Sequence, residues 1–111
     1  MWLLDVNIDL AVKGFLVKQG IACRTSQEHG WQGLANGALV QASNQAGFRV
    51  LLTRDRLLQE SAAATLKRYP EFALVLLTMH QAPSKKYMAG FVAQWQRAPI
   101  KPVPGQLVIW P

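Results

Sequence analysis

The chain has 111 residues, half of them hydrophobic, so we expect a single domain over residues 1–111 with a core that needs no disulfide. Its only cysteine, Cys23, excludes an intramolecular disulfide and is typical of a reducing cytoplasm. Twelve lysines and arginines against six acids give a net charge of +6, which favours a polyanionic partner such as RNA.

Short apolar runs alternate with segments whose apolar residues recur at helical spacing. The first helix is expected from Ile8, whose face includes Val12 and Leu16, to Gly20. We expect Asn36 and Ser84 to cap the second and fourth helices. The expected strands are 2–6, 21–26, 49–53, 72–78 and 106–110, and the later helices cover 36–46, 57–68 and about 84–95.

Strands and helices alternate four times along the chain, and a fifth strand follows. This order is typical of an α/β three-layer sandwich, with a mostly parallel central sheet and helices on both faces. In the second helix, Leu39, Ala42 and Ala46 are expected to face the core. No apolar run reaches the roughly 20 residues that span a membrane. The N-terminus has no basic stretch leading into an apolar one. We therefore expect a cytoplasmic protein that makes no membrane contact.

Two apolar runs lead into an aspartate, Asp5 in "MWLLDVNIDL" and Asp55 in "VLLTRDRLL". Because ligands bind beyond the carboxyl ends of parallel strands, these two side chains are expected at one rim of the sheet. A divalent cation such as Mg²⁺ or Mn²⁺ is the natural partner of two neighbouring carboxylates. A second interpretation stays open, in which Asp5 and Asp55 cap helices. In that case Asp55 pairs with Arg54 or Arg56, which otherwise would clamp phosphates.

The residues around the two aspartates resemble motifs of the PIN-domain nucleases. "LLDVN", with Asp5 and Asn7, is similar to their first motif, an aspartate followed two residues later by Asn or Ser. "LLTRD", with Thr53 and Asp55, is similar to their Thr-x-Asp motif at a strand end. The intervening "EHGWQGLANGALVQASNQAGFRV" resembles small PIN-like proteins associated with toxin–antitoxin pairs. The resemblance covers residues 2 to about 78, and the remainder matches in its strand–helix–strand order.

The resemblance implies metal-dependent RNA cleavage with Asp5 and Asp55 as the catalytic metal ligands, and Mg²⁺ or Mn²⁺ as the cofactor. The family has a third acid near the start of its middle helix, where this chain has Ala38. The substrate-binding residues implied by the match, together with the flanking arginines, are Asn7, Thr53, Arg54 and Arg56, and the candidate auxiliary groups are Glu28, Asp9 and His80.

The favoured function is thus a toxin-like ribonuclease, with RNA as substrate and an antitoxin protein as a further partner. The main alternative is a catalytically inactive PIN-like module that binds nucleic acid or protein. A signalling receiver domain is a weaker alternative, on the basis of Asp55, Thr78 and Lys101, because the acidic pair of receivers is missing beside Asp5. The last strand, which ends in Trp110, indicates a homodimer formed by edge pairing.

Overall fold

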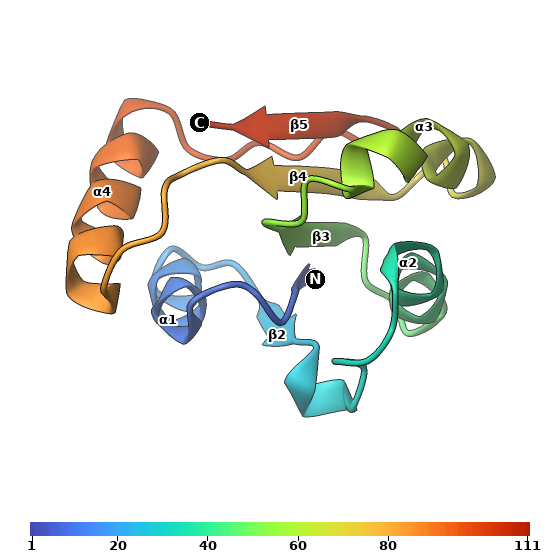
Figure 1. Cartoon of the computed structure of the whole chain (residues 1–111), viewed down its shortest axis with the longest axis horizontal. Coiled ribbons are helices and arrows are strands. Elements are labelled where there is room, and N and C mark those ends of the chain that lie inside the picture. Colours follow the sequence, from blue (N-terminus) through green and yellow to red (C-terminus); the bar gives the residue numbers. More distant parts are fainter.

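The computed structural model describes residues 1–111, and its central feature is one five-stranded parallel sheet between two layers of helices (Figure 1). The α/β three-layer architecture expected from the sequence is confirmed. In chain order the elements are β1 (Trp2–Leu4), α1 (Leu10–Lys18), β2 (Cys23–Thr25), a short 3-10 helix η1 (Gln27–His29), α2 (Asn36–Gln45), β3 (Val50–Thr53), α3 (Leu58–Arg68), β4 (Ala73–Leu77), α4 (Ser84–Arg97) and β5 (Leu107–Trp110).

The strand order of the sheet is β2-β1-β3-β4-β5, and every neighbouring pair is parallel. After β2 the chain crosses to the other side of β1, so the direction in which strands are added reverses between the adjacent strands β1 and β3. This is the flavodoxin-like order of doubly wound sheets, which signalling receivers also have. In such sheets ligands bind outside the carboxyl ends of the strands where the order reverses. The strand order therefore predicts a ligand site at the residues that follow β1 and β3.

Each face of the sheet has its own hydrophobic core. Helices α1 and α4 cover one face, and α2 and α3 cover the other (Figure 1). Alternate strand residues point to opposite faces, so Leu4 and Leu52 pack under α1 and α4, whereas Leu3 and Leu51 pack under α2 and α3. Both faces are covered, which explains why β3 and β4 are buried at every position and apolar apart from Thr53 at the end of β3.

The starts of α1, α2 and α4 differ from the sequence expectation. Helix α1 begins at Leu10, because Asp9 takes the cap position and its carboxylate accepts from the Ala11 N–H over 2.9 Å. Ile8 is buried in the core but precedes the helix. Asn36 is the first residue of α2 and makes no capping bond.

Ser84 likewise does not cap α4, since it lies inside the helix and Pro83 takes the preceding position. In α2 the expected inward position of Ala46 is also wrong. Ala46 is exposed just beyond the helix, and Val40 and Ser43 are buried together with Leu39.

The C-terminal strand β5 is an edge strand, as expected, but its last residue does not offer a free surface. Trp110 is buried, and its indole Nε1 donates to the Ala98 carbonyl over 2.8 Å. Ile109 points the other way and is 52% exposed. No helix combines the length and the apolar character that crossing a bilayer requires.

Candidate functional site

The ends of β1 and β3 bring together the two motifs that lie far apart in the sequence. Leu4 pairs with Leu52 in the sheet, and the Asp5 N–H extends the ladder by donating to the Leu52 carbonyl over 2.9 Å. Asp5 therefore lies beside Thr53, the last residue of β3, and Asp55 follows two residues later. The sequence placed these residues at one rim, and the register makes Asp5 and Thr53 direct neighbours.

The hydroxyl of Thr53 is the centre of this arrangement, and the residue is fully buried. It donates to Asp5 Oδ2 over 2.7 Å and accepts from the Asp55 N–H over 3.1 Å. Asn7 Nδ2 makes a longer contact of 3.5 Å with the same oxygen. With its donor and acceptor capacity used inside the protein, Thr53 positions the aspartates and has no proton to offer a substrate.

Asn7 joins the segment after β1 to the segment after β3 through both atoms of its amide. Its Oδ1 accepts from the Arg54 N–H over 3.1 Å, while its Nδ2 faces the Thr53 hydroxyl. An aspartate here could not donate to Thr53, and a leucine could make neither bond. The amide therefore explains why this position suits Asn.

The carboxylate of Asp55 begins the turn that leads into α3. Its Oδ1 accepts from the Leu57 N–H over 3.0 Å, and its backbone carbonyl accepts from the Leu58 N–H over 3.1 Å. Asp55 does not cap α3, because Leu57 takes the cap position, and no arginine lies within 4.0 Å of its carboxylate, so the expected ion pair does not form either. The capping interpretation is wrong for Asp5, since Asp9 caps α1.

The two arginines beside Asp55 have different environments. Arg54 is half-buried, donates through Nη2 to the Met79 carbonyl over 3.4 Å, and lies over the Tyr87 ring at 5.8 Å from its centroid. Arg56 is exposed, and its side chain makes no hydrogen bond or ion pair. Only Arg54 is therefore held by the fold, and it is held on the side of α1 and α4.

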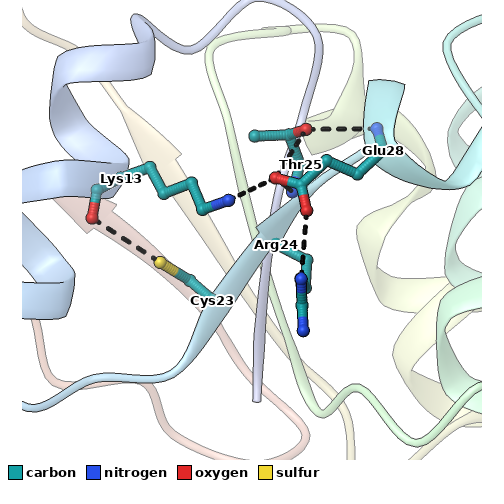
Figure 2. Close-up of polar contacts among 5 residues, drawn as sticks. All are labelled: Lys13, Cys23, Arg24, Thr25 and Glu28. Atoms are coloured by element: carbon teal, nitrogen blue, oxygen red, sulfur yellow. Dashed lines mark hydrogen bonds and ion pairs between the residues drawn. The ribbon is translucent and has the colours of Figure 1, made fainter.

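Glu28 is committed to another interaction. Its carboxylate pairs with Lys13 of α1 and, over 3.4 Å, with Arg24 of β2, and it also accepts from Thr25 (Figure 2). The hydrogen bond from Lys13 is the main reason that the pKa of Glu28 is lowered to about 2. Glu28 ties η1 to α1 and β2 and makes no contact with Asp5.

The two other auxiliary candidates, Asp9 and His80, also make no polar contact with Thr53, Asp5 or Asp55. Asp9 caps α1, as described above. His80 is exposed in the segment between β4 and α4 and makes no polar contact within the protein. No three side chains of histidine, cysteine, aspartate or glutamate come together as a group that could hold a metal ion.

The donor set at the rim consists of two carboxylates. Asp5 Oδ1 accepts from the Val6 N–H over 2.8 Å, and Asp55 Oδ2 has no partner within the protein. Neither carboxylate has a cationic side chain within 4.0 Å. Such oxygen ligands fit a hard divalent cation. Ala38, exposed in the first turn of α2, adds no third carboxylate. The residues fit a cation whose remaining ligands are water or substrate oxygens.

Sequence reasoning missed Tyr87 and Gln81 as neighbours of the site. A cavity of about 270 Å³ opens beside Asn7 and Arg54, and Tyr87 and Gln81 belong to its lining. Tyr87 belongs to the apolar stripe of α4, which was expected to be core, and it is indeed buried. Its hydroxyl was the available signal, since the other buried residues of that stripe, Phe91 and Trp95, have none.

Lys101, which supported the receiver alternative, lies in the connection that precedes β5. Asp55 instead follows its strand. Lys101 is exposed and pairs with no carboxylate. Comparison of the chain with family models, with curated proteins and with solved structures gives no match.

Proposed function

We propose that this protein is a metal-dependent ribonuclease with a two-carboxylate site formed by Asp5 and Asp55. The observation that carries the proposal is the convergence of both motifs on the Thr53 hydroxyl, beside carboxylates that no protein cation neutralises. The PIN-like resemblance of the motifs, and a toxin-like role with an antitoxin partner, belong to the same proposal.

The position of these residues supports a binding role over a purely structural one. They lie at the carboxyl ends of the two strands where the sheet order reverses, where α/β sheets bind ligands. The turn before α3 accounts for one carboxylate oxygen of Asp55, but no helix start accounts for Asp5, whose carboxylate accepts from Thr53 and Val6 and caps no helix.

The charge of the chain supports a polyanionic substrate. Of the twelve lysines and arginines only Lys13 and Arg24 pair with a carboxylate, and both pair with Glu28. The other ten have no carboxylate partner. Such an excess of unpaired positive charge raises the local concentration of a polyanion and accelerates its association.

Each residue has a distinct role in this proposal. Asp5 and Asp55 would hold Mg²⁺ or Mn²⁺, which when bound polarises a phosphodiester and lowers the pKa of a bound water. Thr53 positions Asp5 and Asp55 by hydrogen bonds, and Asn7 holds Thr53 and the Arg54 backbone in place, which reduces the reorganisation that binding requires. Arg54 and Arg56 contribute positive charge next to the carboxylates, which attracts the scissile strand.

A second candidate function is a non-catalytic module that binds RNA or protein. Ala38 favours it, because an exposed methyl group stands where the resembling nucleases have their third acid. Two carboxylates hold Mg²⁺ weakly unless substrate oxygens complete the coordination.

Cleavage of a structured, fluorescently labelled RNA with Mn²⁺ or Mg²⁺ tests the proposal. The variants are Asp5→Asn, Asp55→Asn and Ala38→Glu. Glu71→Gln is the matched control, because it also removes one negative charge but lies just before β4, at the amino ends of the strands and away from the candidate site. We expect cleavage by the wild type and by Glu71→Gln, and loss in both aspartate variants. Asn retains an acceptor for the turn at residue 55, so folding is preserved.

The other outcomes identify the alternative. A silent wild type together with cleavage by Ala38→Glu would indicate a site that has lost its third acid and serves binding. Equal cleavage by the wild type and by both aspartate variants would refute the assignment of Asp5 and Asp55.

A further inference from the structure

A cavity of about 270 Å³ lies next to the Thr53 centre, between the start of α1, the end of β3 and the segment that leads into α4. Its polar lining residues are Asn7, Asp9, Arg54, Gln81 and Tyr87. Since one water molecule takes about 30 Å³ of liquid volume, the cavity has room for a tetrahedral oxyanion and several waters. It shares Asn7 and Arg54 with the candidate nuclease site but contains neither Asp5 nor Asp55.

Two buried polar atoms of the lining have no hydrogen-bond partner, namely the Tyr87 hydroxyl and Arg54 Nε. Tyr87 is 5% exposed, so solvent does not compensate for the missing bond. Buried polar groups without a partner are rare and costly, and where they occur they often mark a site that binds something. Both groups can donate a hydrogen bond, and Arg54 also carries a full positive charge.

Arg54 is pre-positioned for such a role. Its Nη2 bond to the Met79 carbonyl and its contact with the Tyr87 ring hold the guanidinium at the cavity wall. No carboxylate lies within 4.0 Å of it, although Asp9 lines the same cavity. The carboxylate of Asp9 already accepts from the Ala11 N–H at the N-terminus of α1. Arg54 is therefore a fixed cation without an anionic partner.

We infer that this cavity is an oxyanion subsite in which Arg54 and the Tyr87 hydroxyl bind a phosphate group. The phosphate oxygens accept from three donors, namely Arg54 Nε, Arg54 Nη1 and the Tyr87 hydroxyl. Because Arg54 Nε and the Tyr87 hydroxyl are buried, a small shift of the two side chains is needed to bring these atoms within hydrogen-bond distance of the phosphate. The phosphate comes either from RNA, next to the scissile bond, or from a free phosphate compound. The RNA role rests on the proposed function, whereas the affinity for phosphate does not.

Titration with inorganic phosphate at constant ionic strength, followed by heteronuclear NMR of the arginine Nε–H and backbone amide groups, tests the inference. We expect saturable shifts of the Arg54 Nε–H resonance. Arg54→Gln is expected to weaken binding about tenfold or more, and Tyr87→Phe about tenfold, because each removes a hydrogen bond to a charged ligand. Arg97→Gln is the matched control: it removes the same charge from an exposed side chain at the end of α4, outside the cavity, and its effect stays below about threefold.

Asp9→Asn separates an oxyanion from other occupants. Asn still caps the helix, and removal of the nearby negative charge is expected to tighten phosphate binding about threefold or more. Weaker binding by Asp9→Asn would indicate an occupant that donates hydrogen bonds, and would overturn the oxyanion assignment. Equal losses in Arg54→Gln and Arg97→Gln, or no saturable shift in the wild type, would also overturn it.

Two further experiments distinguish RNA from a free phosphate compound as the source of the phosphate, and the phosphate subsite from the ribonuclease proposal. An RNA oligonucleotide that displaces inorganic phosphate supports the RNA role, and absence of competition overturns that role in favour of a free phosphate compound. Asp55→Asn, titrated in the presence of a chelator, is expected to keep the phosphate affinity. Failure of RNA cleavage with phosphate binding intact would therefore refute the ribonuclease proposal alone, and cleavage without phosphate binding would refute the subsite alone.

Discussion

Replacement of Thr53 by valine tests whether its hydroxyl holds the two motifs together. Valine keeps the shape and the β-branching of threonine but removes the hydrogen bond to the Asp5 carboxylate and the acceptor for the Asp55 N–H. A hydrogen bond to a charged group contributes about 1.5–3 kcal/mol and a neutral one about 0.5–1.5 kcal/mol, so we expect a loss of about 2–4.5 kcal/mol in the free energy of unfolding. For a chain of 111 residues this lowers the melting temperature by roughly 9–19 °C.

Thermal unfolding followed by circular dichroism measures this loss, with Thr53→Ser as the control. Serine keeps the hydroxyl and removes one methyl group, which costs about 1 kcal/mol, or roughly 4 °C. A Thr53→Val protein that melts within about 4 °C of the Thr53→Ser protein would show that the hydroxyl contributes little, and would refute the positioning role argued for Thr53.

Three further substitutions test single features of the structure. Tyr87→Phe removes a buried hydroxyl that has no partner, so without phosphate it is expected to raise stability by about 1 kcal/mol in thermal unfolding, and a clear loss would show that the hydroxyl is satisfied in solution. Because the pKa of Glu28 is lowered from 4.5 to about 2, first of all by Lys13, its stabilising effect is present above pH 4.5 and disappears as the pH falls to about 2. Glu28→Gln should therefore lower the melting temperature at neutral pH but not at pH 2, and a difference that persists at pH 2 would contradict this cause. Asp9→Ala removes the cap bond to Ala11 and is expected to cost about 1 kcal/mol in chemical denaturation, with Asp9→Asn costing less, and equal losses in the two variants would argue against capping.

Much of the fold was readable from the sequence, because hydrophobic periodicity reports burial directly. The largely apolar runs that form β3 and β4 are buried on both faces, and the stripe of Tyr87, Phe91 and Trp95 forms the inward face of α4. The wrong predictions concern which residue takes the cap position at the start of a helix. Asn36 and Ser84 have side chains suited to capping, but each lies inside its helix, and residues with no side-chain acceptor take the cap position.

The candidate site was readable only in part. Asp5 and Asp55 were placed at one rim because both follow apolar runs in a parallel sheet. The sequence could not show that Glu28 forms ion pairs with Lys13 and Arg24, which are 15 and four residues away. Their approach to Glu28 depends on how α1 packs against β2.

The sequence by itself determined the alternation of strands and helices, the apolar faces and the identity of the polar residues at the strand ends. These follow from the local order of residues, which periodicity records. The tertiary structure alone decided that β1 lies between β2 and β3, and that the Thr53 hydroxyl joins Asp5 to Asp55. It alone placed Arg54 over Tyr87 in a shared cavity. Strand order and register depend on contacts between residues tens of positions apart, and no local pattern encodes such contacts.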